Sequence, residues 1–305
     1  MTSPSERPDF PDVIDSSLIA AFRSCPQKAF LEYIQHWKAR EPSVHLHAGA
    51  AFARGLEVAR DAFYVRGEAP ERAIEEGLHA LITAYGTFEC PPEYAKSLER
   101  MCGALEFYFE RYPLGHDKAI PMTLPGGKRG IEFSFLEPID RRHPVTGDPI
   151  LYSGRFDMLV DYENMKLGED DKTASQLGAS WSRQWDLRSQ FTAYVWGAGQ
   201  AGIKLDGFLV RGVSILKTKY DTLEAITYRP QWQVERWYQT VLRDVDRMLQ
   251  AWESGVWDFN LDHACAEYGG CAFRSVCLMQ QPEVLLLQNF EKRRWDPVTR
   301  TESVL

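Results

Sequence analysis

Apolar residues recur at helical spacing through the first third of the chain. One stripe near residue 50 consists of Phe52, Leu56, Ala59 and Phe63. Pro70 is suited to the first position of a following helix, and a further helix is expected from about residue 94 to 112. The segment of about 50–115 is therefore predicted to be helical. An earlier helix is predicted to begin at Ser16 and Ser17, which are good capping residues, and to bend or break at Pro26.

The pattern changes to alternation after about residue 126. Strands are expected at 131–138, 151–162, 165–174, 207–216 and 223–230. Helical spacing returns at about 181–199 and at 231–254, the second of which is strongly amphipathic. Glu163 and Asn164 form a short turn between two of the strands. This order predicts an α/β fold with a central mixed sheet and helices on its faces.

Composition and charge narrow the class of protein. The 305 residues are 44% hydrophobic and 26% charged, as in ordinary globular proteins, and one domain of this length is feasible. Neither a secretory leader nor a run of about 20 apolar residues is present, so we expect a cytoplasmic protein with no membrane partner. The net charge of −8 argues against nonspecific coating of nucleic acid.

A local basic groove is still compatible with that charge. Candidate cations for binding DNA are Arg183, Arg188, Arg211, Lys217 and Lys219, with Lys292, Arg293 and Arg294 as a further group. Trp181, Trp185 and Trp295 lie near these cations in sequence, where they could stack on bases. Core packing explains the tryptophans, and a solvated face explains the cations, equally simply.

Two carboxylates and a lysine are concentrated on two neighbouring strands. Asp157 follows Gly-Arg-Phe, and the next strand carries Asp170-Asp171-Lys172-Thr173. Because side chains alternate along a strand, Asp170 and Lys172 share a face and Asp171 points to the other. A hairpin would bring Asp157 close to Asp170. Such carboxylates, with a main-chain carbonyl, suit magnesium or manganese, and the lysine could act on water or phosphate.

The helix after these strands carries two more candidates. Gln190 and Tyr194 are four residues apart and therefore lie on one helical face, where an amide and a phenol could steady the lysine or a scissile phosphate. Packing of the aromatic residues against the sheet is the alternative.

Four cysteines stand out at the two ends of the chain. Cys25 lies alone near the start, whereas Cys265, Cys271 and Cys277 form a Cys-x5-Cys-x5-Cys triplet near the end. Structural zinc sites usually have shorter spacings, and four thiolates with longer, uneven spacings suit an iron–sulfur cluster. Ordinary buried thiols and a zinc site are the alternatives. A cluster would tie a segment of about 260–280 to the first helix.

These motifs resemble those of the PD-(D/E)XK nuclease superfamily, within it the RecB-type branch that includes iron–sulfur exonucleases of CRISPR adaptation. The matching pieces, in order, are Phe22–Pro26, Gly154–Asp157, Asp170–Thr173, Gln190 with Tyr194, and the cysteine triplet. The resemblance implies a single nuclease domain over 1–305, with a restriction-endonuclease-like core at about 126–230.

The resemblance also implies an activity and its cofactors. It implies a Mg²⁺- or Mn²⁺-dependent deoxyribonuclease, an exonuclease that acts on single-stranded DNA or duplex ends. Asp157, Asp170 and the main-chain carbonyl of Asp171 would bind the metal, with Lys172, Gln190 and Tyr194 as further catalytic residues. Cys25, Cys265, Cys271 and Cys277 would hold a structural [4Fe–4S] cluster. The setting would be a bacterium, archaeon or phage-infected cell, with recombination, repair or CRISPR-adaptation proteins as partners.

One departure from the RecB-type pattern affects the metal site. The branch has Gly-x-x-x-His in its early helix, whereas Gly49 is followed at the histidine position by Ala53. Glu57, one turn further along the same face, could substitute as a ligand, and Glu132 is a weaker candidate. A catalytically inactive DNA-binding or assembly subunit, which keeps the fold and the cluster, is the alternative function.

Overall fold

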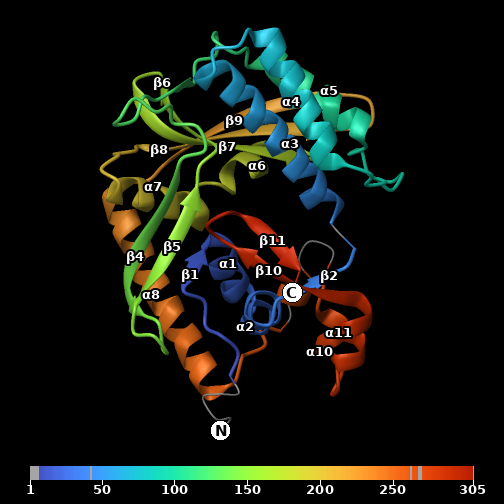
Figure 1. The fold of residues 1–305 in the computed structure, drawn as a ribbon, viewed down its shortest axis with the longest axis vertical. Coiled ribbons are helices and arrows are strands. Elements are labelled where there is room, and N and C mark those ends of the chain that lie inside the picture. The colour runs from blue at the N-terminus through green and yellow to red at the C-terminus, as the bar shows by residue number, and fades with distance from the viewer. Residues whose placement is uncertain (1–6, 42, 262, 267–269, 305) are drawn as a thin grey trace. The chain divides into compact units, whose positions relative to one another are not determined.

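The computed structural model describes residues 7–41, 43–261, 263–266 and 270–304, and its chain divides into two compact units (Figure 1). Unit 1 comprises 1–41, 135–154 and 235–305, and unit 2 comprises 42–134 and 155–234. The chain thus passes from one unit to the other four times. Such repeated passage is compatible with a single domain, so the expected single domain stays a prediction.

Unit 2 contains the five-stranded mixed sheet, in the order β3-β6-β7-β8-β9. Its strands are β3 Ile120–Pro121, β6 Met158–Tyr162, β7 Met165–Ala174, β8 Gly207–Ile215 and β9 Tyr220–Tyr228. β7 and β8 run parallel, and the other neighbours are antiparallel. The turn Glu163–Asn164 joins β6 to β7 as predicted, with both residues at positive φ. The predicted α/β fold with a mixed sheet and flanking helices is confirmed.

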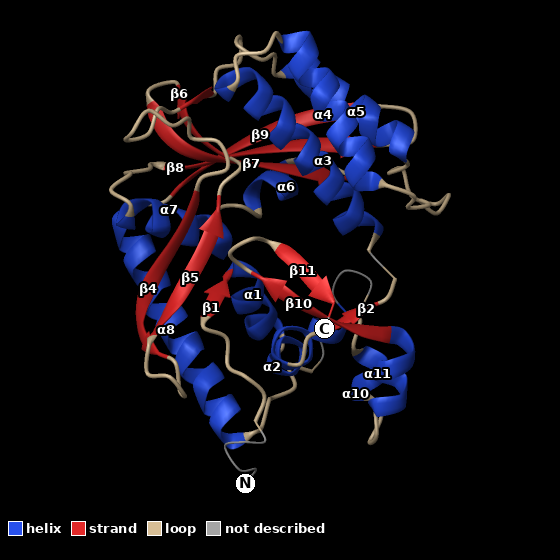
Figure 2. Ribbon diagram, in the orientation of Figure 1, coloured by secondary structure: helices blue, strands red, loops and turns tan. Residues whose placement is uncertain are grey.

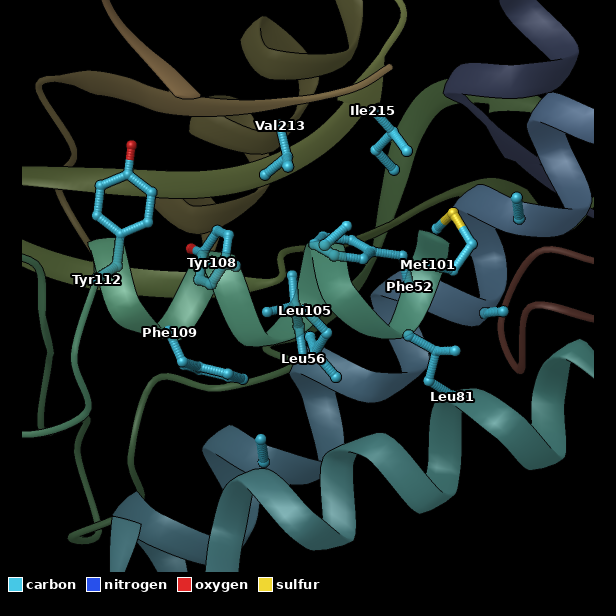
Figure 3. Close-up of a cluster of buried hydrophobic side chains, with 14 of the residues drawn as sticks. Phe52, Leu56, Leu81, Met101, Leu105, Tyr108, Phe109, Tyr112, Val213 and Ile215 are labelled. Carbon is cyan, nitrogen blue, oxygen red and sulfur yellow. The ribbon is translucent and has the colours of Figure 1, made fainter. Parts of the chain in front are cut away.

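Two groups of helices accompany this sheet (Figure 2). They are α3 Val44–Arg60, which continues as the π-helical turn η3 Asp61–Val65, then α4 Pro70–Tyr85, α5 Leu98–Arg111, α6 Ala179–Arg183 and α7 Ser189–Gln200. A buried cluster joins α3, α4 and α5 to Val213 and Ile215 of β8 (Figure 3). The predicted helical segment of 50–115 is therefore confirmed, and its apolar stripe faces the sheet.

The face of the sheet beside α7 is packed by aromatic rings. Phe208 of β8 stacks on Phe156 and on Phe191 of α7, with ring centroids 5.5 and 4.6 Å apart. Gly168 of β7 lies under the Phe208 ring, where an added Cβ would collide with it. This packing fixes α7 beside β7, the strand that carries Asp170 and Lys172.

Unit 1 combines two three-stranded sheets with the long helix α8. One sheet has the order β1-β5-β4 and the other β11-β10-β2. The strands are β1 Val13–Asp15, β2 Trp37–Ala39, β4 Ser134–Arg142, β5 Pro149–Arg155, β10 Phe290–Asp296 and β11 Thr301–Val304. The helices are α1 Ser16–Ser24, α2 Pro26–Ala29 with η2 Phe30–Ile34, α8 Gln231–Ser254, α9 His263–Ala266, α10 Arg274–Cys277 and α11 Glu283–Asn289.

The structure corrects three local expectations. Asp15, rather than Ser16 or Ser17, caps α1, because its carboxylate accepts hydrogen bonds from the N–H groups of Ser17 and Leu18. The strand expected at 131–138 begins only at Ser134 and runs to Arg142, since Glu132 has a left-handed backbone (φ 51°). The strand expected at 151–162 is divided into β5 and β6 at Phe156–Asp157. The predicted helix at 231–254 is confirmed as α8.

Candidate active site

Asp157 lies at the point where the chain enters β6. Its Oδ2 accepts a hydrogen bond from the main-chain N–H of Asp171, at 3.0 Å, so the two strands hold it against the acidic end of β7. Burial raises the pKa of Asp157 to about 7, with further contributions from the charges of Asp170 and Asp171. The expected approach of Asp157 to Asp170 is therefore present.

Lys172 and Asp170 lie on one face of β7, as alternation predicts. Lys172 Nζ is 2.5 Å from Asp170 Oδ2, and the Asp170 residue is only 3% exposed. Burial lowers the pKa of Lys172, but the charges of Asp170 and Asp157 outweigh it and raise the pKa above its usual value. The lysine is therefore held as a cation beside two carboxyl groups.

The next side chains on β7 point the other way. Asp171 Oδ2 accepts a hydrogen bond from Arg60 Nη1 at 2.6 Å, and Arg60 Nη2 binds Glu169 Oε1 at 2.6 Å. The same Nη2 donates to the phenol of Tyr108 at 2.7 Å. Asp171 is thus anchored to α3 by its side chain, while its main chain faces Asp157.

Arg211 extends this buried network across the sheet. Its guanidinium donates two hydrogen bonds to Asp117, at 2.5 and 2.8 Å, and one to Glu224 at 3.0 Å. Only 1% of Arg211 is exposed. The expectation that Arg211 contributes to a surface DNA groove is therefore wrong, because its charge is used inside the protein.

Two glutamates approach Asp157 from outside β6 and β7. Burial raises the pKa of Glu132 to about 8. The charges of Asp157 and Glu57 also raise it, whereas the charge of Arg155 lowers it. Arg155 Nε lies 2.9 Å from Glu132 Oε2. Glu57 is also paired with Arg54 at 2.5 Å on the exposed side of α3. The charge of Glu57 acts on Glu132, and the role of Glu57 as a metal ligand stays a prediction.

Gln190 and Tyr194 share a face of α7, as predicted. Gln190 Nε2 donates to Tyr194 Oη at 3.0 Å. Tyr194 is 1% exposed and packs on Phe156, with ring centroids 4.9 Å apart. The charge of Tyr194 is also among those that raise the pKa of Lys172. Both the catalytic and the packing interpretations of Tyr194 therefore have a basis in the geometry.

The arrangement has the donor chemistry of a divalent-cation site. Burial first, and neighbouring carboxylates second, raise the pKa values of Asp157 and Glu132, so that a positive ion beside them would favour their ionised forms. Within the described residues no three His, Cys, Asp or Glu side chains converge as a ready-made ligand set. The Lys172 ammonium occupies one of the oxygens of Asp170 instead. The residues therefore fit a hard cation, provided that Lys172 releases that oxygen.

Sequence reasoning missed the residues that support the site from behind. Arg60, Glu169 and Tyr108 form one group, and the only hint in the sequence is a charged residue in register with the apolar stripe of α3. Lys96, 4% exposed, donates to Thr173 Oγ1 at 2.8 Å, and burial lowers its pKa to about 8. No local pattern reveals that contact.

The remaining candidate cations and tryptophans are divided between the units: those at 181–219 belong to unit 2, and Lys292, Arg293, Arg294 and Trp295 belong to unit 1. Lys217 Nζ binds the carbonyl of Pro92 at 2.9 Å, and Arg183 Nε donates to its own helix at Ala179. Arg188 lies beside the Trp185 ring, 6.0 Å from its centroid. Trp181 and Trp185 are 7% and 6% exposed, so they belong to the core rather than to a stacking surface. No interaction places Lys219 at a site.

The four cysteines of the predicted cluster line one cavity within unit 1. Cys25 Sγ accepts from the N–H of Asn260 at 3.5 Å, and the N–H of Cys271 donates to the carbonyl of Cys265 at 3.2 Å. Burial raises the pKa of Cys277 to about 11, and the charges of the other three cysteines add to this. The four cysteines thus line the same cavity of about 20 Å³, but within the described residues they do not form a ready-made ligand set, and the cluster stays a prediction.

A comparison with protein families shows to which family the chain belongs. A model described as the PD-(D/E)XK nuclease superfamily matches residues 16–278, most of the chain. The chain belongs to the PD-(D/E)XK nuclease superfamily. The match includes Cys25, Cys277 and all of the candidate catalytic residues. No curated protein matches this superfamily member closely enough to serve as a relative.

Solved structures agree with the fold of the superfamily. A candidate exonuclease from Eubacterium rectale aligns over 83% of this chain and 87% of its own, with 13% identity and a TM-score of 0.51. A second structure, SSO0001, covers 81% and 79% with 12% identity and a TM-score of 0.32. At such identities the first similarity concerns the fold alone, and the second supports no argument.

Proposed function

We propose that this superfamily member is a metal-dependent deoxyribonuclease that hydrolyses phosphodiester bonds. The observation that carries the proposal is the meeting of Asp157, Asp170 and Lys172 at one end of the five-stranded sheet. Burial of three mutually interacting charges is costly, and such costs concentrate at functional sites. The superfamily match supplies the reaction class.

Asp157, Asp170 and the main-chain carbonyl of Asp171 would hold Mg²⁺ or Mn²⁺, with Glu57 as a further ligand. When bound, the ion supplies a Lewis acid for the phosphodiester and its attacking water. Asp157 must lose its proton to bind it, and the Asp171 N–H orients that carboxylate.

Lys172 would orient or deprotonate the attacking water and offset charge on the phosphate. In the metal-free protein burial lowers its pKa, but the charges of Asp170 and Asp157 outweigh burial and raise it. An ammonium released from Asp170 can contact the phosphate oxygens, whose negative charge grows in the transition state. Gln190 and Tyr194 hold a hydrogen-bonded pair beside it and limit where it can move.

The second part of the proposal concerns the cysteines. Cys25, Cys265, Cys271 and Cys277 would hold a [4Fe–4S] cluster that links α1 and α2 to the C-terminal segment. The lining of one cavity by all four cysteines supports it, as does the N–H of Asn260, which donates to Cys25 Sγ, because such donors tune these clusters. A single zinc ion would need four sulfurs about 2.3 Å from one point.

Exonuclease action on single strands or duplex ends is the finer form of the proposal. The candidate exonuclease from Eubacterium rectale with the same fold supports it. Recombination, repair or CRISPR adaptation in the cytoplasm of a bacterial, archaeal or phage-infected cell would supply such DNA ends and the partner proteins. The RecB-type motifs support this setting.

End-labelled single-stranded DNA tests the activity directly. Anaerobically purified protein should degrade it with Mn²⁺ and not with chelator, and Lys172→Ala should lose about 10²- to 10⁴-fold in rate while DNA binding is nearly intact. Lys166→Ala is the matched control, because this lysine lies on the same strand but is paired at the surface with Asp161. Intact DNA under every metal, from folded and brown protein, would favour the inactive binding subunit.

A further inference from the structure

Unit 1 contains a second, larger cavity, separate from the one lined by cysteines. Its volume is about 330 Å³, within the range of small-molecule sites. The N-terminal segment, the turn after η2 and the β10–β11 hairpin enclose it, and every lining residue belongs to unit 1. Among these are the aromatic residues Phe10, Tyr33 and Trp295, the basic residues His36 and Arg294, and four aspartates, Asp9, Asp12, Asp15 and Asp296.

The aromatic side chains are held in fixed orientations. Trp295 Nε1 donates to Asp15 Oδ2 at 2.9 Å, and Asp15 is itself fixed as the cap of α1. The Tyr33 ring carries the Lys38 ammonium 5.0 Å from its centroid. Phe10 is 3% exposed and packs edge-on against Trp252. A preordered aromatic lining favours a flat ligand, because stacking then costs little side-chain entropy.

The polar groups of the lining divide into those already used and those with capacity left. Asp15 is occupied by the helix cap and Trp295, and Asp296 accepts from the N–H groups of Val298 and Thr299 in the hairpin turn. Within the described part of the chain, the Arg294 guanidinium and the His36 ring form neither a hydrogen bond nor an ion pair. Arg294 and His36 therefore keep N–H groups available, and the exposed Asp9 and Asp12 keep acceptor oxygens.

His36 has an unusual backbone and a positive surrounding. Its φ is 64°, a left-handed conformation uncommon outside glycine, and its carbonyl accepts from the Arg293 N–H at 2.8 Å. Burial lowers the pKa of His36, and the charges of Arg294 and Lys292 lower it further. The charge of Asp9 acts in the opposite direction and raises it. The positive charge available to a ligand at this end of the cavity is therefore that of Arg294, beside His36.

We propose that this cavity binds one nucleotide, with the base against Trp295 and Tyr33 and the phosphate at Arg294 and His36. Size, flat walls and unused donors are what a nucleoside monophosphate requires. Asp9 and Asp12, both exposed at the lining, supply acceptors for exocyclic amino groups of the base. The choice of ligand class rests on the proposed function. The nucleotide is either free or one unit of a DNA strand.

Calorimetric titration in chelator separates binding from hydrolysis. The probes are dCMP, deoxyribose 5-phosphate, inorganic phosphate and a ten-residue oligo(dC), against wild type and Lys172→Ala. We expect saturable dCMP binding that is equal in both proteins, and weaker binding of the two probes without a base. A much tighter oligo(dC) identifies a strand unit as the ligand, whereas equal affinity identifies a free nucleotide. Absence of saturable binding by dCMP and by oligo(dC) would overturn the proposal.

Two variants and a neighbouring control locate the binding. Arg294→Ala removes a charged donor and His36→Gly removes the ring while suiting the left-handed backbone, so each should weaken binding about tenfold. Arg293→Ala is the control, because Arg293 is paired with Glu291 at 2.7 Å and is absent from the lining. Equal losses in Arg293→Ala and Arg294→Ala would refute the site. Loss of DNA cleavage in Lys172→Ala with unchanged dCMP binding shows that the two proposals succeed or fail separately.

Discussion

Arg60 of α3 and Asp171 of β7 form a buried ion pair, 2.6 Å between Nη1 and Oδ2, directly behind the candidate active site. Their side chains are 4% and 2% exposed. Asp171 donates its N–H to Asp157, and α3 carries Glu57 one turn before Arg60. One contact therefore aligns the strand that would bind the metal with the helix that would complete the site.

We predict that Arg60→Ala lowers the free energy of unfolding by about 3–5 kcal/mol, because it leaves Asp171 and Glu169 buried without their partner. Arg54→Ala, which removes an exposed pair on the same helix, should cost about 0–1 kcal/mol. Denaturant titration in chelator measures both. Similar small effects of the two substitutions would mean that the buried carboxyl groups are satisfied in some other way.

The carboxyl cluster predicts how stability depends on pH in the absence of metal. The pKa of Glu132 is raised to about 8 and that of Asp157 to about 7 by burial and like charge. The folded protein therefore binds these protons more tightly than the unfolded chain, and stability is lost as the pH rises through the folded pKa values. Below the ordinary pKa of each group this contribution is fully present.

We expect the free energy of unfolding of Glu132→Gln to fall less than that of wild type between about pH 5 and pH 8, when both are measured in chelator. Glu110→Gln, an exposed glutamate on α5, is the control and should leave the profile unchanged. Mg²⁺ should raise the melting temperature of wild type more at pH 8 than at pH 5, since the ion binds ionised carboxylates. A wild-type profile identical to that of Glu132→Gln would contradict the raised pKa.

Helices and strands were predicted correctly where the sequence signal lies within the element itself, and were missed where it depends on distant parts of the chain. β7 is recovered at its predicted residues because the turn at Glu163–Asn164 marks where it begins, and α8 because its amphipathic pattern is uninterrupted over 24 residues. The break between β5 and β6 is not, since the apolar pattern continues through Phe156 while the chain changes sheet. β2, β10 and β11 are short and rich in charged residues, so only their pairing with distant strands makes them visible.

The same distinction applies to the candidate site. Asp157, Asp170 and Lys172 were predicted together because a hairpin and strand alternation are local rules. Arg60 and Lys96 reach β7 from 111 and 77 residues away in sequence. No spacing rule identifies such partners, and a buried arginine on a helix looks like a surface residue until its carboxylates are known.

The cysteines predict a colour and a stability difference. Cys271→Ser should give a bleached protein with less than the full iron content and a lower melting temperature, because one serine cannot replace a thiolate ligand. Cys90→Ser is the control, as Cys90 belongs to unit 2 and is not among the residues that line the cavity. Iron content, absorbance near 400 nm and thermal unfolding are measured on anaerobic preparations. Iron retained at full stoichiometry by Cys271→Ser would remove this residue from the ligand set.

Glu57 provides the last test, because it stands one turn beyond Ala53, the position at which the RecB-type pattern has a histidine. Its charge contributes to the raised pKa of Glu132, and we propose that it shares a cation with that cluster. We predict that Glu57→Gln raises the Mn²⁺ concentration for half-maximal DNA cleavage by about tenfold or more. Adding Ala53→His should restore part of the loss, since imidazole would then approach from the same helical face.

Glu106→Gln, an exposed glutamate on α5, serves as the control for loss of one surface charge. If Glu57→Gln and Glu106→Gln show the same Mn²⁺ dependence, Glu57 serves only its pair with Arg54. Rescue by Ala53→His, in contrast, would show that the site tolerates either ligand from α3. The departure of this chain from the RecB-type pattern would then be a change of ligand rather than the loss of an active site.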